Sequence, residues 1–192
     1  MAGEVRAKMV AGAMQLLARQ GLQSTSFSEV LALTGAPRGS VYHHFPDGKE
    51  QLVTAAIDHA SALALAYVER AAGGDAEQIT RRFFAMWHGV LEHSRLTAGC
   101  AVLAVAVAAD TDTLLEHAAS IFRGWRARLT ELLVDGGLAQ ADAVRFATTL
   151  IAAAEGAVVL SRAERSLEPL ELVADELAAQ VRRLARGSVA GD

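Results

Sequence analysis

The chain has 192 residues, of which 52% are hydrophobic and 21% are charged, and its formal net charge is −4 at pH 7. This composition excludes an intrinsically disordered chain, and the negative net charge excludes a protein coated in positive charge for indiscriminate nucleic-acid binding. The only cysteine, Cys100, excludes an internal disulfide framework and a cysteine-based zinc site, so we expect a cytoplasmic protein without metal or cofactor.

The residue types also predict the fold class. Alanine and leucine are abundant, whereas proline occurs only three times and aromatic residues make up 5% of the chain. Alanine and leucine favour helices, and β-branched and aromatic residues favour strands. We therefore predict an all-α protein, with about nine helices.

The first 48 residues predict three helices with a tight turn between the second and the third. Apolar residues three and four positions apart predict a helix over 5–17. Ser26, followed three positions later by Glu29, is typical of a capping box and predicts the start of a short second helix. The turn Gly35-Ala36-Pro37 then leads into a third helix over 38–45. Together these segments predict a helix-turn-helix domain over residues 1–48.

The rest of the chain predicts a second, larger helical domain over residues 49–192. The longest uncharged stretch, Leu96 to Ala109, is 14 residues long, which is less than the roughly 20 that a membrane-spanning helix needs. We therefore expect it to form a buried core helix, and we expect no membrane association. The predicted helices cover approximately 49–72, 75–93, 102–109, 111–134, 142–163 and 168–185.

The third helix has an apolar inner side and a polar outer side. Val41 and Phe45, four positions apart, are predicted to face the core, which leaves polar residues for an outer surface. Arginine pairs with guanine, hydroxyls bind bases or phosphates, and a glycine such as Gly39 allows close approach of the backbone to a duplex. Residues 1–50 carry five basic and four acidic side chains, whereas the rest carries 13 and 18, so DNA contact would be local to this region. The candidate contacts are Ser26, Ser28, Arg38, Gly39, Ser40, Tyr42, His43, His44 and Lys49.

The run from Ser26 to Leu52 resembles the TetR family of transcriptional repressors. The resemblance rests on the segment Gly35 to Phe45 and on Lys49-Glu50-Gln51-Leu52, and it covers about the first 55 residues closely. The link from Phe45 to Lys49 is slightly longer than in the family's common form and is similar to that of a subgroup with multidrug-responsive repressors. The number and lengths of the downstream helices look like the family's ligand-binding and dimerisation domain.

The resemblance implies a homodimer that binds a palindromic DNA operator and is released by a small hydrophobic effector. It implies that Arg38, Gly39, Ser40 and Tyr42 face bases or the nearby backbone. It also implies that His43, His44 and Lys49 hold phosphates. A regulator of this kind is a cytoplasmic repressor and not an enzyme.

Two residue sets in the larger domain follow from side-chain chemistry alone. Segments that mix apolar walls with a few polar groups could surround an effector pocket. They contribute Met86, Trp87, His88, Cys100, Phe122, Trp125 and Arg126. The last two helices offer small and apolar residues for a four-helix interface between two chains. These are Ala152, Ala153, Gly156, Val159, Leu160, Leu170, Val173, Leu177 and Val181.

Alternatives stay open at this point. The aromatic residues of the larger domain could simply form its core, and the last two helices could simply cover that core. Cys100 is expected to be a buried inert thiol rather than a redox sensor. A helical small-molecule carrier or enzyme that retains a helix-turn-helix only for packing is the second functional hypothesis, although no nucleophile and base pair supports it.

Overall fold

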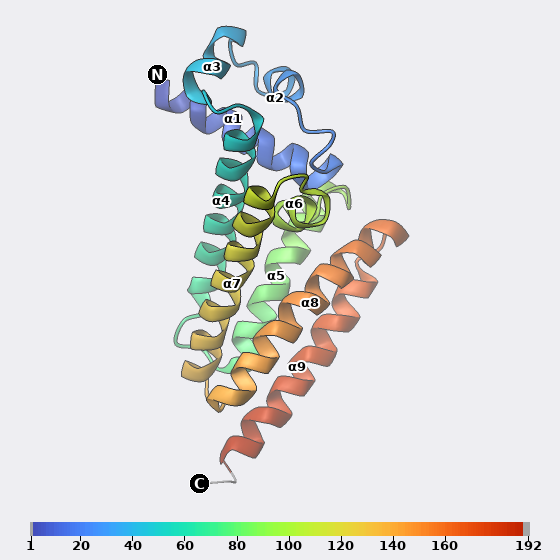
Figure 1. Cartoon of the computed structure of the whole chain (residues 1–192). Coiled ribbons are helices and arrows are strands. Elements are labelled where there is room, and N and C mark those ends of the chain that lie inside the picture. Colours follow the sequence, from blue (N-terminus) through green and yellow to red (C-terminus); the bar gives the residue numbers. More distant parts are fainter. Residues whose placement is uncertain (1, 190–192) are drawn as a thin grey trace. The chain divides into compact units, whose positions relative to one another are not determined.

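The computed structural model describes residues 2–189, and in this range it contains nine α-helices and no strand (Figure 1). The predicted fold class and number of helices are therefore confirmed. Two short 3-10 helices, η1 (Arg38–Ser40) and η2 (Glu69–Ala71), accompany them. The α-helices are α1 (Ala2–Gln20), α2 (Phe27–Thr34), α3 (Val41–His44), α4 (Lys49–Val68), α5 (Ala76–Ser94), α6 (Ala101–Ala108), α7 (Asp112–Asp135), α8 (Gln140–Glu164) and α9 (Glu168–Val189).

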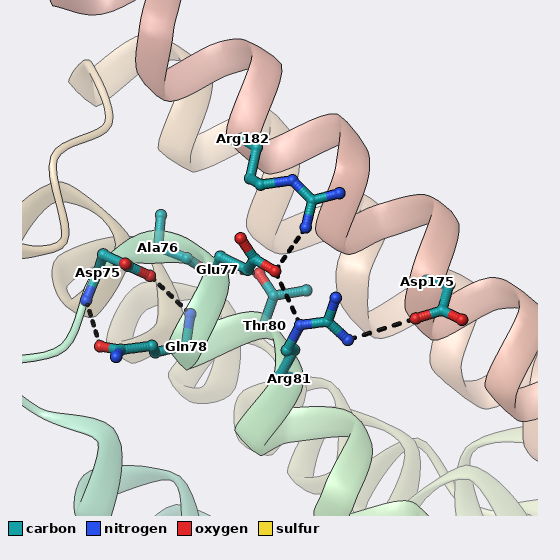
Figure 2. A network of polar contacts seen from close by, with 8 residues as sticks. All are labelled: Asp75, Ala76, Glu77, Gln78, Thr80, Arg81, Asp175 and Arg182. Carbon is teal, nitrogen blue, oxygen red and sulfur yellow. Dashed lines mark hydrogen bonds and ion pairs between the residues drawn. The ribbon is translucent and has the colours of Figure 1, made fainter.

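Local capping chemistry fixes several helix ends. The backbone N–H of Glu29 donates to Ser26 Oγ at 3.2 Å, so Ser26 caps α2 as predicted, but the reciprocal Glu29 side-chain bond of a full capping box is not formed. Asp75 and Gln78 form a complete capping box at the start of α5, with hydrogen bonds of 3.0 and 2.8 Å (Figure 2). Gly35 ends α2 with a φ of +66°, a left-handed conformation that glycine adopts without steric cost.

The helices form two compact units. The first comprises the described residues up to Leu63 together with Cys100–Ile121, and the second comprises Ala64–Gly99 and the described residues from Phe122 onward. The helices α4 and α7 contribute residues to both units. The first unit thus extends beyond residues 1–48, and the predicted functional boundary between residues 48 and 49 stays a prediction.

Close packing of α1 on α2 holds the first unit together. Met9, Ala13 and Leu17 on α1 are almost completely buried, as is Val30 on α2. A Cβ atom at Gly12 would lie only 2.5 Å from Thr34 Cγ2, so glycine is what allows the two helices to approach this closely. The segment that carries most of the candidate DNA contacts, residues 38–44, follows this pair of helices in the chain.

In the second unit, α5 packs against both α8 and α9. Ion pairs reinforce its contact with α9: the Glu77 carboxylate binds Arg182 at 2.6 Å and Arg81 at 2.8 Å, and Arg81 also binds Asp175 at 3.3 Å (Figure 2). The hydrogen bond from Arg81 lowers the pKa of the Glu77 carboxyl, outweighing partial desolvation, and the hydrogen bond from Arg182 lowers it further. The start of α5 is therefore tied electrostatically to α9.

The turn between α7 and α8 closes the second unit at the start of α5. The N–H of Ala76 donates to the carbonyl of Gly136 at 3.0 Å. A Cβ atom at Gly136 would lie 2.8 Å from the Ala76 nitrogen, which leaves room for glycine alone. This backbone contact joins segments about 60 positions apart in the chain.

Two helical segments are long and apolar enough to cross a bilayer by length and composition, namely Lys49–Ala71 and Gln140–Glu164. A search for uncharged stretches alone does not find them, because each contains charged residues. Core helices of helical bundles pass the same test, and half of the relevant window in α8 is buried in the protein. The exposed large apolar side chains of α8 are Val144, Val159 and Leu160.

Candidate nucleic-acid interface

The candidate recognition segment, Arg38–His44, is not the single α-helix that its sequence predicts. It consists of the 3-10 turn η1 followed by the four residues of α3. The Ser40 N–H donates to the Pro37 carbonyl at 3.0 Å, and the Ser40 hydroxyl donates to the same carbonyl at 2.6 Å. A serine hydroxyl that competes for backbone groups favours a helix start over a helix interior, and Gly39 weakens α-helix further.

Buried side chains anchor this segment from within. Val41 and Phe45 are buried, as predicted, and the Phe45 side chain is completely inaccessible. The Phe27 and Phe45 rings lie 6.5 Å apart, which joins the end of α3 to the start of α2. The segment therefore contains little regular helix, and aromatic packing holds it in place.

The opposite side of the segment is open to solvent. Tyr42 is 78% exposed, the largest exposure among the exposed large hydrophobic side chains of the described residues. Arg38, Gly39 and His43 are also exposed, whereas Ser40 and His44 are half-buried. A rigidly anchored segment that presents a tyrosine, an arginine and a histidine to solvent has the donors that contact bases and phosphates in a duplex.

The structure gives Lys49 a contact that sequence reasoning missed. Lys49 is half-buried, and its ammonium donates to the carbonyl of Leu22 at 2.9 Å. The lysine thereby fastens the start of α4 to the loop between α1 and α2. An ammonium group has three N–H bonds, so this contact leaves donors over for a phosphate.

The two candidate serines differ in their hydrogen bonding. Ser26 is half-buried and already accepts the Glu29 N–H as the α2 cap, whereas Ser28 is exposed. Their hydroxyls lie 2.8 Å apart and share a hydrogen bond. A phosphate would therefore reach Ser28 more directly than Ser26.

Sequence reasoning also misses a cation next to the recognition segment. The guanidinium of Arg6 on α1 lies 5.4 Å from the centre of the Phe45 ring, within the range of a cation–π contact. Arg6 is exposed, so its charge adds to that of Arg38 on the first unit. The spacing between α1 and residue 45 is too long for any local sequence pattern to indicate this pair.

A small hollow lies in the second unit, and only one of the predicted pocket residues lines it. Trp125 lines it, and Phe122 packs edge-to-face on Trp125 with ring centres 5.4 Å apart. The hollow has a volume of about 10 Å³, room for no more than one water molecule. Its walls come from Ala64, Leu65, Val68, Phe83, Trp125, Arg128 and Leu129.

The other predicted pocket residues lie elsewhere. Met86 and Trp87 are buried on α5, and His88 is partly exposed, with Nε2 3.7 Å from the Glu171 carboxylate on α9. Arg126 is exposed. Cys100 belongs to the first unit, where its buried sulfur accepts the Leu103 N–H at 3.3 Å and caps α6.

The predicted interface residues divide between surface and core. On α8, Val159 and Leu160 are 51% and 50% exposed, and the neighbouring Ala152, Ala153 and Gly156 are also accessible. On α9, Val173 is half-buried. The prediction is wrong for Leu170, Leu177 and Val181, because α9 turns these three residues into the core of its own unit.

Comparisons with known proteins match both parts of the chain. Residues 9–56 match the model of the bacterial regulatory proteins of the tetR family, and residues 76–176 match that of the C-terminal domain of LmrA/YxaF-like transcriptional regulators. An HTH-type transcriptional regulator of Mycobacterium tuberculosis strain H37Rv is 32% identical over 179 residues, which cover 90% of this chain and 91% of that protein. The regulator LmrA of Bacillus subtilis is 27% identical over 174 residues, which cover 88% and 92%.

Solved structures show the same fold. A TetR transcriptional regulator from Chloroflexus aurantiacus has a TM-score of 0.79 and 30% sequence identity, covering 94% of this chain and 96% of that one. The regulatory protein TetR from Rhodobacter sphaeroides has a TM-score of 0.80 at 20% identity, covering 90% and 96%.

Proposed function

The chain belongs to the TetR family of bacterial transcriptional regulators, and from this premise we propose that it is a cytoplasmic repressor that binds a palindromic operator as a homodimer. Regulators of this family bind DNA and are not enzymes, so the carrier or enzyme hypothesis is set aside. The proposal assigns DNA binding to residues 1–48 and effector binding and dimerisation to residues 49–192.

The observation that carries the proposal is the contrast between Phe45 and Tyr42. Phe45 is fully buried and fixes the recognition segment, while Tyr42 on the same segment is 78% exposed. In our proposal Arg38, Gly39, Ser40 and Tyr42 face bases or the nearby backbone in the major groove. Phosphates would be bound by Ser26, Ser28, His43, His44 and Lys49.

Operator binding requires two copies of this short segment. Seven residues contact few base pairs, whereas a twofold dimer doubles the contacts and matches a palindrome with half-sites about 34 Å apart. The accessible apolar face of α8 supports such a dimer, because small residues there allow close helix packing. Leu160→Glu should convert the dimer to monomers in sedimentation velocity, and a variant that stays dimeric would contradict this interface.

Release by a small hydrophobic effector completes the proposal. The apolar walls of the hollow beside Phe83 and Trp125 favour an apolar guest. The helix α4 begins at Lys49, near the recognition segment in sequence, and contributes Ala64, Leu65 and Val68 to the hollow. We propose that effector binding shifts α4 and lowers operator affinity through a coupling free energy.

The test is an electrophoretic mobility shift with DNA from upstream of the protein's own gene, at several salt concentrations. We expect a shift that weakens steeply as salt increases, because phosphate contacts release counterions. Tyr42→Phe should weaken the shift while leaving dimerisation intact. A shift absent at every salt concentration, or one insensitive to salt, would contradict operator binding through phosphates.

A further inference from the structure

One buried polar group on α5 is not accounted for by the fold. Trp87 is only 5% exposed, and no acceptor among the described side chains and backbone lies within hydrogen-bond distance of its indole Nε1. Buried tryptophan N–H groups usually find a partner, because an unpaired buried donor loses its hydrogen bond to water without replacement. The indole nitrogen of the second tryptophan, Trp125, is not among the buried unpaired polar atoms of the described residues.

The position of Trp87 on α5 relates it to the hollow. Phe83, which lines the hollow, precedes Trp87 by four positions, so both lie on one face of the helix. Trp87 does not itself line the hollow, but side chains in a helix lean toward its N-terminus, so we expect the indole of Trp87 to lie next to the turn that carries Phe83. An effector that enlarged the hollow along α5 toward Trp87 would meet an unpaired donor.

The charge balance of the hollow restricts the effector further. Arg128 is its only charged lining residue among those described, and its guanidinium is paired with two carboxylates. It donates to Glu69 at 2.8 Å through Nη2 and to Glu131 at 2.7 Å through Nη1. The Arg128 hydrogen bond also lowers the pKa of Glu69, so this carboxylate is ionised at neutral pH. Two carboxylates surround this one guanidinium, so the cluster carries a net negative charge that disfavours an anionic guest.

We propose that the indole N–H of Trp87 is the recognition donor of the effector site, and that the effector is an uncharged molecule that offers it a hydrogen-bond acceptor. This inference rests on the proposed function, because it concerns the effector of the proposed repressor. It assigns Trp87 a role in specificity: apolar contacts with Phe83 and Trp125 would hold many guests, and Trp87 would select among them.

The test uses quinoline and naphthalene, two bicyclic aromatic probes of nearly the same shape. Only quinoline carries an acceptor, its ring nitrogen, and it is uncharged at pH 7.5. The chain has two tryptophans, so the full-length ¹⁵N-labelled protein gives two indole N–H resonances, which Trp87→Phe assigns. We expect quinoline to move the Trp87 indole proton downfield, and naphthalene to leave it without that shift while still affecting Trp125. The shifts themselves are measured on the unsubstituted protein, and the variant serves only to assign the two resonances.

Affinities measured with variants provide a second readout. Trp87→Phe should reduce the affinity for quinoline relative to naphthalene by roughly 2- to 10-fold, the value of one hydrogen bond. Trp125→Phe is the matched control, because it trims the same hollow but keeps the donor, and it should weaken both probes by the same factor. Comparing ratios cancels the greater hydrophobicity of naphthalene.

Three results would overturn the inference. They are an unchanged Trp87 resonance with quinoline, no response to either probe, and a long-lived buried water bound to the Trp87 N–H. Gel shifts on the same preparations test the proposed function separately, since Trp87 lies outside the recognition segment. If the wild-type protein binds DNA but does not discriminate between the probes, only this inference fails. If it binds no DNA, the proposed repressor function fails.

Discussion

Replacing Lys49 by methionine separates two tasks of one side chain. Sequence similarity implies that the ammonium holds a phosphate, and the structure shows it donating to the Leu22 carbonyl at 2.9 Å. Methionine keeps most of the apolar stem but removes the donor. A hydrogen bond from a charged group contributes about 1.5–3 kcal/mol, and the partial exposure of Lys49 places the expected loss near the lower limit, at about 1–2 kcal/mol.

Urea unfolding measures the first task and DNA-binding anisotropy measures the second. We expect Lys49→Met to lower the urea midpoint without changing the slope of the transition. In DNA binding, the dependence of log K on log salt should decrease by about one for each phosphate that the variant no longer binds. Lys49→Arg retains a donor, so its urea midpoint and the salt dependence of its DNA binding should both change less.

Lys8→Met on α1 is the matched control. Lys8 is largely exposed and only pairs with Glu4 at 3.4 Å, so its removal should change stability by less than about 0.5 kcal/mol. If Lys49→Met is as stable as Lys8→Met, the Leu22 hydrogen bond contributes nothing and our reasoning about the loop is refuted. If its salt dependence equals that of the wild type, Lys49 does not bind phosphate.

Four further substitutions test other parts of the structure. Tyr42→Ala should leave the melting temperature unchanged, because the side chain is 78% exposed. The same substitution should weaken operator binding at least tenfold (~1.4 kcal/mol) in gel shifts. A melting temperature lowered by several degrees would contradict the surface position of Tyr42. Gly12→Ala should destabilise the protein by about 1–3 kcal/mol in urea unfolding, because the new methyl would lie 2.5 Å from Thr34. Gly89→Ala lies in open space on α5 and should stabilise the protein by up to about 1 kcal/mol. Equal effects of the two substitutions would refute the packing argument. Glu77→Gln should lower the free energy of unfolding at pH values above 4.5, the ordinary pKa of the carboxyl group. This difference in stability from the wild type should vanish as the pH falls through the lowered pKa of Glu77 in the folded state. A stability difference that is constant from pH 7 to pH 3 would contradict an ionic role.

Local signals in the sequence predict the helices well, because caps and turns depend on neighbouring residues. Ser26 before Glu29 and Asp75 before Gln78 mark helix starts, and Gly35 marks an end, through hydrogen bonds and backbone angles within one turn. The apolar period likewise predicts that Val41 and Phe45 lie in the core. It does not predict the 3-10 turn η1, because periodicity does not distinguish an α start from a 3-10 start.

The contacts that the sequence does not predict join segments that are far apart in the chain. The hydrogen bond from Lys49 to Leu22 spans 27 positions, and the Arg6 contact with Phe45 spans 39. No local pattern indicates either pair. On α9, the helical period identifies an apolar stripe with Leu170 and Leu177 but not which neighbour covers it; the structure shows that the same unit does so, and leaves α8 with the accessible face.

The small size of the hollow between Phe83 and Trp125 has a kinetic consequence for any guest that binds there. A cavity of about 10 Å³ does not admit a molecule of even one aromatic ring, so the walls must separate before entry. At high guest concentration the observed association rate should then level off at the opening rate of the walls. Mutations that loosen these walls would speed entry and raise the apparent affinity without adding a single interaction with the guest.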